Sequence, residues 1–160
     1  MTLAQQLNNL IRQLQPKIDS VLGHEVAEAI KSEEIKAIEA TVYDAYGPIM
    51  YDRRGDFVGL ADPENIICEV HNGELHVRNE TPPNPGGTRN NERVTTGKYL
   101  AELIEHGHAR RGGVYDFPKY GATYMGPRPF TQSTVDRLRQ SKKHISALRT
   151  GLKKLGITIR

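Results

Sequence analysis

The stretch IICEVHNGELHVRN, residues 66–79, decides the fold of this 160-residue chain. At its centre, Asn72 and Gly73 tolerate positive φ angles, and this pair is a strong signal for a two-residue β-hairpin turn. Apolar and polar residues alternate on both sides of the turn, as expected for strands with one covered face. In this register Glu69 faces His76 and His71 faces Glu74. The sequence therefore predicts an antiparallel strand pair.

The residues before the hairpin predict helices. Apolar residues recur at helical spacing and then reach Pro16, which suits the first turn of a new helix better than a helix interior; they are Leu3, Leu7, Leu10, Ile11 and Leu14. We expect a short amphipathic helix there. A second helix, the longest in the chain, should begin at Pro16 and stop at Gly47-Pro48.

The remaining segments complete an α+β fold. Residues 49–60 predict a second hairpin, and residues 98–107 (KYLAELIEHG) predict a brief helix closed by Gly107. A final amphipathic helix follows Phe130, with its stripe formed by Val135, Leu138, Ile145, Leu148, Leu152 and Leu155. We expect a single domain, residues 1–160, in which an antiparallel sheet built from hairpins packs against a long N-terminal helix and this C-terminal amphipathic helix.

Two segments rich in glycine and proline have little aliphatic surface to bury. They are residues 81–97 and residues 106–127. Because ordering a residue costs about 1–2 kcal/mol of conformational entropy, we expect a mobile excursion at 81–97 and a flexible loop at 106–127.

Composition excludes several classes of protein. Only 37% of the residues are hydrophobic, and tryptophan is absent. Cys68 is the only cysteine, so an intramolecular disulfide and a thiolate zinc cluster are excluded. The N-terminus lacks the pattern of a signal peptide, and no apolar run reaches the length that spans a bilayer. We expect an intracellular origin and no membrane partner.

Charge is distributed unevenly along the chain. Residues 1–47 carry four Lys or Arg against seven Asp or Glu, whereas residues 131–160 carry eight against one. This polarity indicates a nucleic-acid-binding face or head-to-tail contacts between identical subunits. The candidate contacts with DNA in a lumen, or with an acidic partner, are Lys142, Lys143, Lys153 and Lys154.

Histidines and acids raise the hypothesis of a metal site. On the hairpin, two imidazoles and two carboxylates share one face, and near residue 106 a second set consists of Glu102, His106 and His108. Outward-pointing pairs on a sheet rarely converge to metal-bonding distance, and no second helical half-motif accompanies Glu102 and His106. Solvated pairs account better for both sets. We expect neither a metal nor another cofactor, and no catalytic residue.

The glycine-rich loop combines aromatic and arginine side chains, a composition enriched at protein interfaces. The candidate interface residues are Arg110, Arg111, Tyr115, Phe117, Tyr120, Tyr124, Arg128 and Phe130. The alternative is that these aromatics cover the domain's own core. Because they are separated from the basic final helix, they favour partner docking over base stacking.

Two stretches resemble a known family. YLAELIEHGHARRGG, residues 99–113, followed by MGPRPFTQSTVDRLRQ, residues 125–140, is similar to the C-terminal half of the tail-completion or neck proteins of long-tailed double-stranded-DNA bacteriophages. VYDAYGPIMYDRRGDFVGLADPENI, residues 42–66, looks like an N-terminal half found among such proteins. The resemblance covers residues 38–155, and its motifs encode turns and packing.

The resemblance implies a structural virion protein without enzymatic activity. Such a subunit would be assembled in the host bacterial cytoplasm into a homo-oligomeric ring, sixfold or twelvefold, at the head–tail junction or the top of the tail tube. Its neighbours would be head-connector and tail-tube or tail-terminator proteins, and DNA would pass through the lumen. The alternatives are a sequence-nonspecific nucleic-acid-binding protein that uses the basic final helix and, more weakly, a metal-dependent enzyme.

Overall fold

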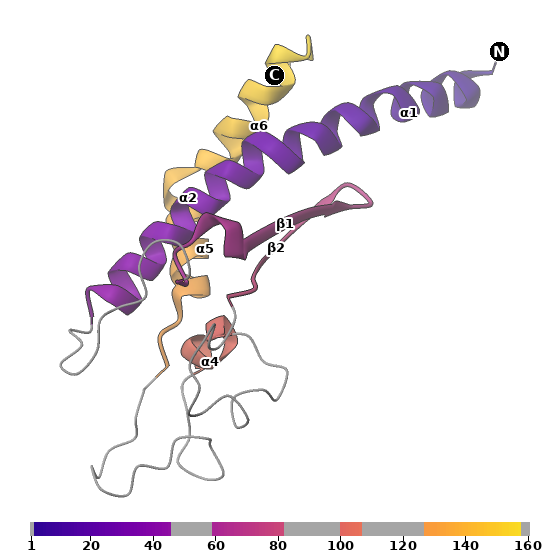
Figure 1. Ribbon diagram of the computed structural model, residues 1–160. Coiled ribbons are helices and arrows are strands. Elements are labelled where there is room, and N and C mark those ends of the chain that lie inside the picture. Colours follow the sequence, from indigo (N-terminus) through magenta and orange to yellow (C-terminus); the bar gives the residue numbers. More distant parts are fainter. Residues whose placement is uncertain (1, 46–58, 82–99, 107–126, 158–160) are drawn as a thin grey trace, which may run out of the picture.

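A computed structural model of the chain describes residues 2–45, 59–81, 100–106 and 127–157. Figure 1 shows a long helical rod that crosses the C-terminal helices, with a β-hairpin alongside it. The hairpin is antiparallel and the rest of the described chain is mainly helical, so the predicted α+β class is confirmed.

The rod contains four consecutive helical segments. They are α1 (Leu3–Val21), the π-helical turn η1 (Leu22–Val26), α2 (Ala27–Ile38) and a second π-helical turn, η2 (Glu39–Tyr43). The residues at the joints keep right-handed helical angles, so the axis is continuous. Thr2 begins the rod with a capping box, in which its side chain accepts from the Gln5 amide and the Gln5 side chain accepts from the Thr2 amide.

The predicted helix boundary at Pro16 is wrong, because α1 continues through it. Proline's fixed φ is compatible with a helix, and the cost lies mainly in the missing hydrogen bond to the carbonyl four residues earlier. Pro16 and Arg12 are both exposed, so water can reach the carbonyl that the proline leaves without an amide donor.

Two wide turns interrupt the regular hydrogen bonding of the rod. In η1 the amide of Ala27 donates to the carbonyl of Leu22, and in η2 the amide of Asp44 donates to the carbonyl of Glu39 at 2.8 Å. Both bonds join residues five apart, which is the π-helical spacing. The apolar periodicity of the sequence does not reveal these turns.

The predicted hairpin at residues 66–79 is confirmed. A short 3₁₀ turn, η3 (Pro63–Asn65), leads into β1 (Ile66–His71), which pairs with β2 (Glu74–Asn79). Glu69 lies opposite His76 and His71 opposite Glu74, as the turn signal requires. Asn72 and Gly73 have φ angles of 53° and 82°. The second hairpin, predicted at residues 49–60, lies almost entirely outside the described residues.

The C-terminal half contains α4 (Leu100–His106), α5 (Phe130–Ser141) and α6 (Lys143–Lys154). The predicted brief helix at α4 is confirmed, but the single final helix is wrong. Lys142 adopts a left-handed conformation with φ 55° and ψ 20°, and this divides the final helix into α5 and α6. No glycine or proline marks the break in the sequence.

Two hydrophobic clusters hold the C-terminal helices against the rod. One joins α2 and η2 to α4 and α5, and its buried residues are Ile38, Val42, Leu60, Ala101, Ile104 and Phe130. The other joins α1 and η1 to α6, and its buried residues are Val21, Val26 and Leu152. The rod therefore contributes residues to both clusters.

The excursion predicted at 81–97 begins with a residue that the structure buries. The Thr81 side chain is fully buried, and its hydroxyl donates to the Asn79 side-chain oxygen at 2.6 Å. This contact lies at the end of β2, at the first residue of the predicted excursion. The remainder, residues 82–97, and residues 107–126 of the predicted flexible loop lie outside the described chain.

The packing of α6 on α1 leaves no space for a side chain at Gly151. A Cβ atom there would lie 2.4 Å from Cγ1 of Val21. We predict that Gly151→Ala lowers the free energy of unfolding by about 1–2 kcal/mol, because overpacking outweighs the gain in helix propensity. Gly23→Ala is the control, since its Cβ would meet Val70 at an ordinary 3.5 Å. Urea unfolding that ranks both variants equally would contradict this account.

Candidate functional site

A buried carboxylate joins three helices. Glu33 on α2 is 2% exposed, and its oxygens accept from Lys143 Nζ at 2.6 Å, Lys36 Nζ at 3.2 Å and Arg137 Nε at 3.2 Å. Lys36 belongs to the same helix, whereas Arg137 lies on α5 and Lys143 on α6. One side chain therefore anchors both C-terminal helices to the rod.

The protonation of Glu33 follows from these partners. The hydrogen bond from Lys143 is the largest cause that lowers the pKa of Glu33 from 4.5 to about 2, with Lys36 contributing and burial opposing. The same hydrogen bond raises the pKa of Lys143. Glu33 thus stays ionised across the physiological pH range.

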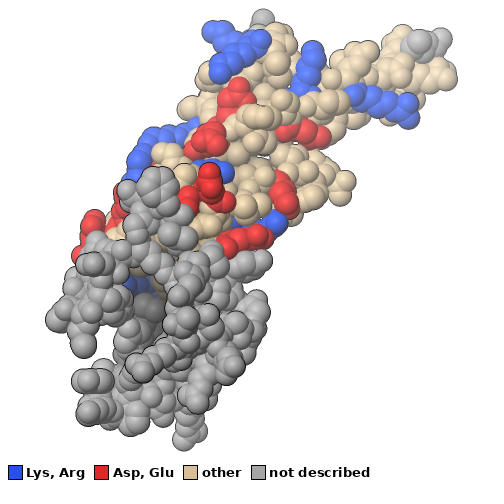
Figure 2. All heavy atoms as spheres, viewed as in Figure 1, with Lys and Arg blue, Asp and Glu red and all other residues tan. Residues whose placement is uncertain are grey.

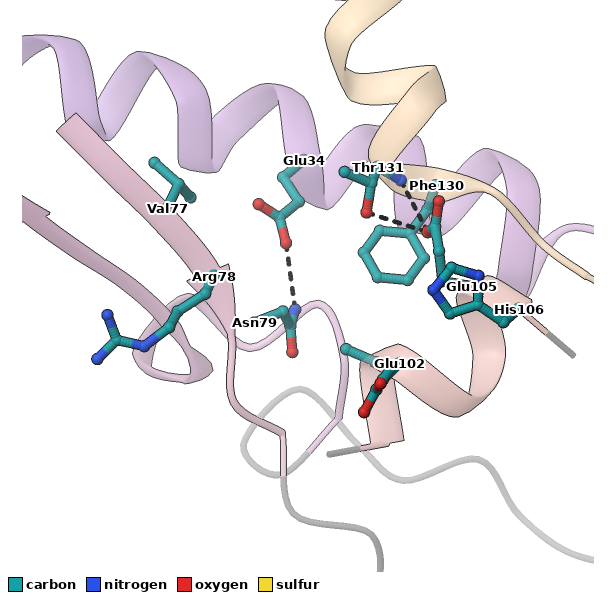
Figure 3. Close-up of a pocket in the computed structure, with 10 residues that line it drawn as sticks. Glu34, Val77, Arg78, Asn79, Glu102, Glu105, His106, Phe130 and Thr131 are labelled. Carbon is teal, nitrogen blue, oxygen red and sulfur yellow. Dashed lines mark hydrogen bonds between the residues drawn. The ribbon is translucent and has the colours of Figure 1, made fainter. Parts of the chain in front are cut away.

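The neighbouring residue, Glu34, behaves in the opposite way. It is 6% exposed, and its Oε1 accepts from Asn79 Nδ2 at 3.3 Å (Figure 3). Burial is the largest cause that raises the pKa of Glu34, and the negative charge of Glu105 adds to it. The amide of Asn79 lowers this pKa but does not offset the burial.

Glu34 lines a pocket of about 200 Å³ between α2, β2, α4 and α5 (Figure 3). At the far wall, Glu105 of α4 accepts from the backbone amide and the hydroxyl of Thr131, each at 3.0 Å. Glu105 thereby satisfies free donors in the first turn of α5. The pocket is smaller than the roughly 300–1,000 Å³ of typical ligand sites. Of its acids, Glu105 caps α5 and Glu34 contacts Asn79 of β2.

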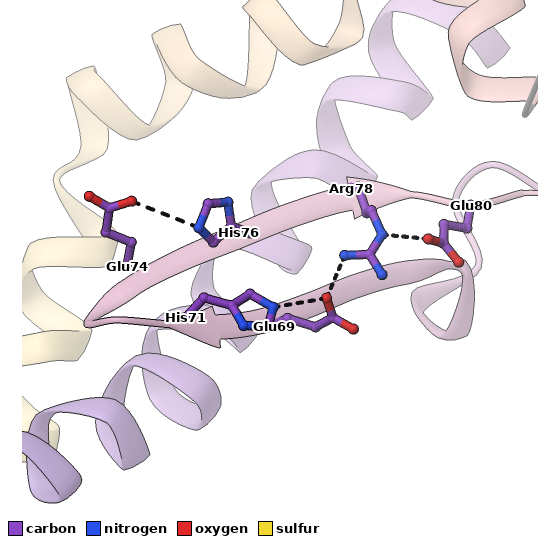
Figure 4. A network of polar contacts seen from close by, with 6 residues as sticks. All are labelled: Glu69, His71, Glu74, His76, Arg78 and Glu80. Atoms are coloured by element: carbon purple, nitrogen blue, oxygen red, sulfur yellow. Dashed lines mark hydrogen bonds and ion pairs between the residues drawn. The ribbon is translucent and has the colours of Figure 1, made fainter.

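The hairpin carries a polar network on one face (Figure 4). Glu69 accepts from Arg78 Nη1 at 2.6 Å and lies 3.3 Å from His71 Nε2, and Arg78 also pairs with Glu80. His76 lies 3.8 Å from Glu74, and the two imidazole rings are 5.6 Å apart. Arginine is the largest cause that lowers the pKa of Glu69 to about 2.

No metal-binding group is present among the side chains that the structure describes. There, no three or more His, Cys, Asp or Glu residues are arranged to hold a metal ion. Glu69 is committed to Arg78 instead. Of the second candidate set, Glu102 and His106 lie on α4, while His108 is outside the described ranges.

Two of the predicted interface residues lie inside the described chain. Phe130 is 2% exposed and belongs to the chain's own core, which is the alternative that the sequence left open. Arg128 donates from Nη1 to the carbonyl of Val42 at 3.1 Å, and its amide donates to Ile104. The others lie outside the described residues: Arg110, Arg111, Tyr115, Phe117, Tyr120 and Tyr124.

The four candidate lysines divide into two pairs. Lys143 contacts Glu33, and Lys154 Nζ lies 3.5 Å from Glu25, so these two bind acids of the rod. Lys142 and Lys153 are exposed. On the face shown in Figure 2, Lys and Arg gather towards the upper end and most Asp and Glu lie below them. Two of the basic C-terminal residues therefore pair with acidic N-terminal residues of the same chain.

An apolar stripe on the first half of α1 is the largest feature that sequence reasoning missed. Four of its residues are at least half exposed: Leu3 (82%), Leu7 (56%), Leu10 (50%) and Ile11 (50%). The pattern predicted an amphipathic helix but gave no sign that its apolar face would lie beyond α6. Figure 1 shows this end of α1 projecting past the hairpin and α6.

Comparison with known proteins identifies a phage-associated family. The YomN family model matches residues 6–154, and the chain belongs to this family. The chain is 30% identical over 139 residues to the SPbeta prophage-derived uncharacterized protein YomN of Bacillus subtilis (strain 168), covering 84% of each chain. No solved structure matches significantly. The predicted bacteriophage association is confirmed at this level.

None of the helices in the described part of the chain is long and apolar enough to cross a bilayer.

We predict that Glu33→Gln destabilises the fold by about 1–2 kcal/mol at pH 7, because it weakens charge-assisted hydrogen bonds to α5 and α6. The pKa of Glu33 is lower in the folded protein than in the unfolded chain. The contribution of ionised Glu33 to the free energy of unfolding is therefore complete above about pH 5 and is lost as the pH falls towards about 2. Urea unfolding at several pH values should show the difference shrinking in acid. Exposed Glu39→Gln is the control, and an equal loss at both ends of the pH range would contradict the assignment.

For Glu34→Gln we predict the opposite sign. Burial raises the pKa of Glu34 above 4.5 in the folded protein. The contribution of its neutral carboxyl to the free energy of unfolding is therefore complete below about pH 4.5 and is lost as the pH rises through the folded pKa. A neutral amide avoids the cost of a buried charge and should raise the free energy of unfolding by about 1 kcal/mol at pH 8. Thermal unfolding at pH 4 and pH 8 measures this. A variant less stable than wild type at pH 8 would show that the carboxylate is needed.

Proposed function

We propose that this chain is a structural virion protein that assembles into a homo-oligomeric ring at the phage head–tail junction or at the top of the tail tube. The observation that carries the proposal is membership of a family with a prophage-derived member. The resemblance of residues 99–113 and 125–140 to tail-completion and neck proteins narrows it to this position. In this role the protein performs no reaction and uses no cofactor.

The organisation of the chain suits an assembly subunit. α2, α4 and α5 form one hydrophobic cluster, while α1 extends well beyond it with an exposed apolar stripe. Exposed apolar residues that gather in a stripe are typical of protein contacts. In the virion the neighbours would be the head-connector protein and a tail-tube or tail-terminator protein.

The exposed lysines favour a second candidate function. Lys142 and Lys153 are available to phosphate groups, and both would suit a sequence-nonspecific nucleic-acid-binding protein. In the ring they would face the DNA in the lumen or an acidic partner. Because Lys143 and Lys154 bind Glu33 and Glu25, the free basic surface is smaller than the sequence suggests.

We predict that a phage deleted for this protein accumulates separate heads and tails, and that the wild-type chain supplied in trans restores joined particles. A triple variant, Tyr115→Ala, Phe117→Ala and Tyr124→Ala, should fail to restore them, since aromatic anchors at interfaces commonly contribute about 2 kcal/mol or more each. Electron microscopy and plaque counts measure joining. The circular dichroism of the purified variant verifies that it folds.

The nucleic-acid alternative is tested with Lys142→Gln and Lys153→Gln. Under the ring proposal these changes lower only weak DNA binding, and each lost phosphate contact removes roughly 0.9 from the slope of log affinity against log salt. Normal joining in the deletion phage, together with tight binding of a particular DNA sequence at physiological salt, would replace the ring with the nucleic-acid function.

A further inference from the structure

The apolar stripe of α1 has the spacing of a coiled-coil seam. Leu3, Leu7, Leu10 and Leu14 are separated by four, three and four residues, as are the a and d positions of a heptad repeat. Leu14 is half-buried, and the preceding members of the seam are at least half exposed. The seam is therefore uncovered over its first turns and becomes covered as the rod meets α6.

The same apolar face continues into the core. Ile18 and Val21, the next apolar residues along α1, belong to the cluster that contains Leu152 of α6. α6 thus covers the later part of this face with a helix of the same chain. Over the first part, no helix among the described residues takes the corresponding place. Continuity with a helix-packing surface indicates that the uncovered part is also a surface for a helix.

The residues that flank the seam are uncharged. With Leu7 at a and Leu10 at d, the e and g positions that border a partner helix are Ala4, Gln6, Ile11 and Gln13. The only charged residue between positions 2 and 16 is Arg12. Arg12 falls at f, on the side away from the seam. Two copies of this helix can therefore approach without placing like charges opposite each other, whereas charged e and g positions commonly select a different partner.

The polar face also distinguishes a protein partner from a lipid surface. Amphipathic helices that lie on membranes carry many Lys and Arg on their polar face, which attract anionic headgroups. Here that face consists mainly of Gln and Asn, with Arg12 as the one cation before Lys17. The chemistry of the face therefore favours another helix.

We propose that the first half of α1 pairs with the same segment of a second copy of this chain, through a seam formed by Leu3, Leu7, Leu10 and Leu14. Ile11 widens the seam at its e position. The seam is only two heptads long, so the pairing depends on concentration and is strengthened when many copies are held close together. The proposal rests on the ring function for its biological setting, where subunits lie side by side, but its physical basis is the stripe alone.

The test is sedimentation velocity on the full-length protein over a wide range of concentrations. We expect wild type to shift to a larger species as the concentration rises. The double variant Leu7→Gln, Leu10→Gln should weaken this association by about tenfold or more, because two apolar side chains are removed from the contact. Gln keeps helix propensity high, so the monomer should keep its helix content by circular dichroism.

The matched control is Asn8→Gln, Arg12→Gln, which places the same residue type on the other side of α1. It should associate like wild type. A wild-type chain that stays monomeric at every concentration, or a control that loses association as fully as the seam variant, would overturn the proposal. So would seam-dependent flotation with vesicles of phosphatidylglycerol and phosphatidylcholine in the absence of self-association, since that result assigns the stripe to a lipid surface.

The outcome is separable from the virion test. A seam variant that stays monomeric while joined particles form normally would support the pairing and show that head–tail joining does not need it. Failure of the ring function in the deletion phage would leave the concentration dependence of the wild-type chain unchanged.

Discussion

The placement of the C-terminal helices depends on the buried carboxylate of Glu33. It receives a hydrogen bond from Arg137 on α5 and another from Lys143 on α6. A buried carboxylate without cations would be costly, and an arrangement that brings both helices to the rod adds two cations to the one that Lys36 supplies from α2. The left-handed Lys142 fits the same constraint, because it ends α5 and starts α6 where Lys143 can reach Glu33. Hydrophobic packing holds the helices at each end, and this ionic contact sets how they lie between the two clusters.

Glu33 and Glu34 are adjacent on α2, and the rotation of about 100° between them gives two identical side chains opposite pKa shifts. Both are buried, yet one faces cations from α5 and α6, and the other faces Asn79 and the negative charge of Glu105. The pKa of the first falls and that of the second rises. The helix therefore presents an ionised carboxylate to its C-terminal partners and one that favours its neutral form to the hairpin and α4.

Local chemistry predicted those parts of the fold that depend on a few neighbouring residues. The Asn72-Gly73 turn fixed the strand register, and with it the partners on the polar face of the hairpin. The helix boundaries at Pro16 and Lys142 were predicted wrongly. An exposed proline is tolerated within α1, and Lys142 takes a left-handed conformation that ends α5, which the local sequence does not signal. Glu33 gave no signal, because it is one acid among seven in residues 1–47 and two of its three cations, Arg137 and Lys143, lie 104 and 110 residues away in sequence. The candidate aromatic loop stays a prediction.

The two π-helical turns decide which way each part of the rod faces. Val21 and Val26 are five residues apart, and in a regular α-helix, at about 100° per residue, they would point in clearly different directions. The wider turn at η1 narrows that angle, so both side chains enter the cluster with Leu152. The rod is about 60 Å long at 1.5 Å per residue. Within it, η1 sets the rotation of α1 about the helix axis relative to α2. If the same residues wound as a regular α-helix, the leucines near the N-terminus would rotate away from their present azimuth relative to α6, whereas removing one residue from η1 would restore the α-helical pitch and leave that azimuth nearly unchanged. The direction in which the exposed leucines of α1 point therefore depends on the width of the η1 turn as well as on the leucines themselves.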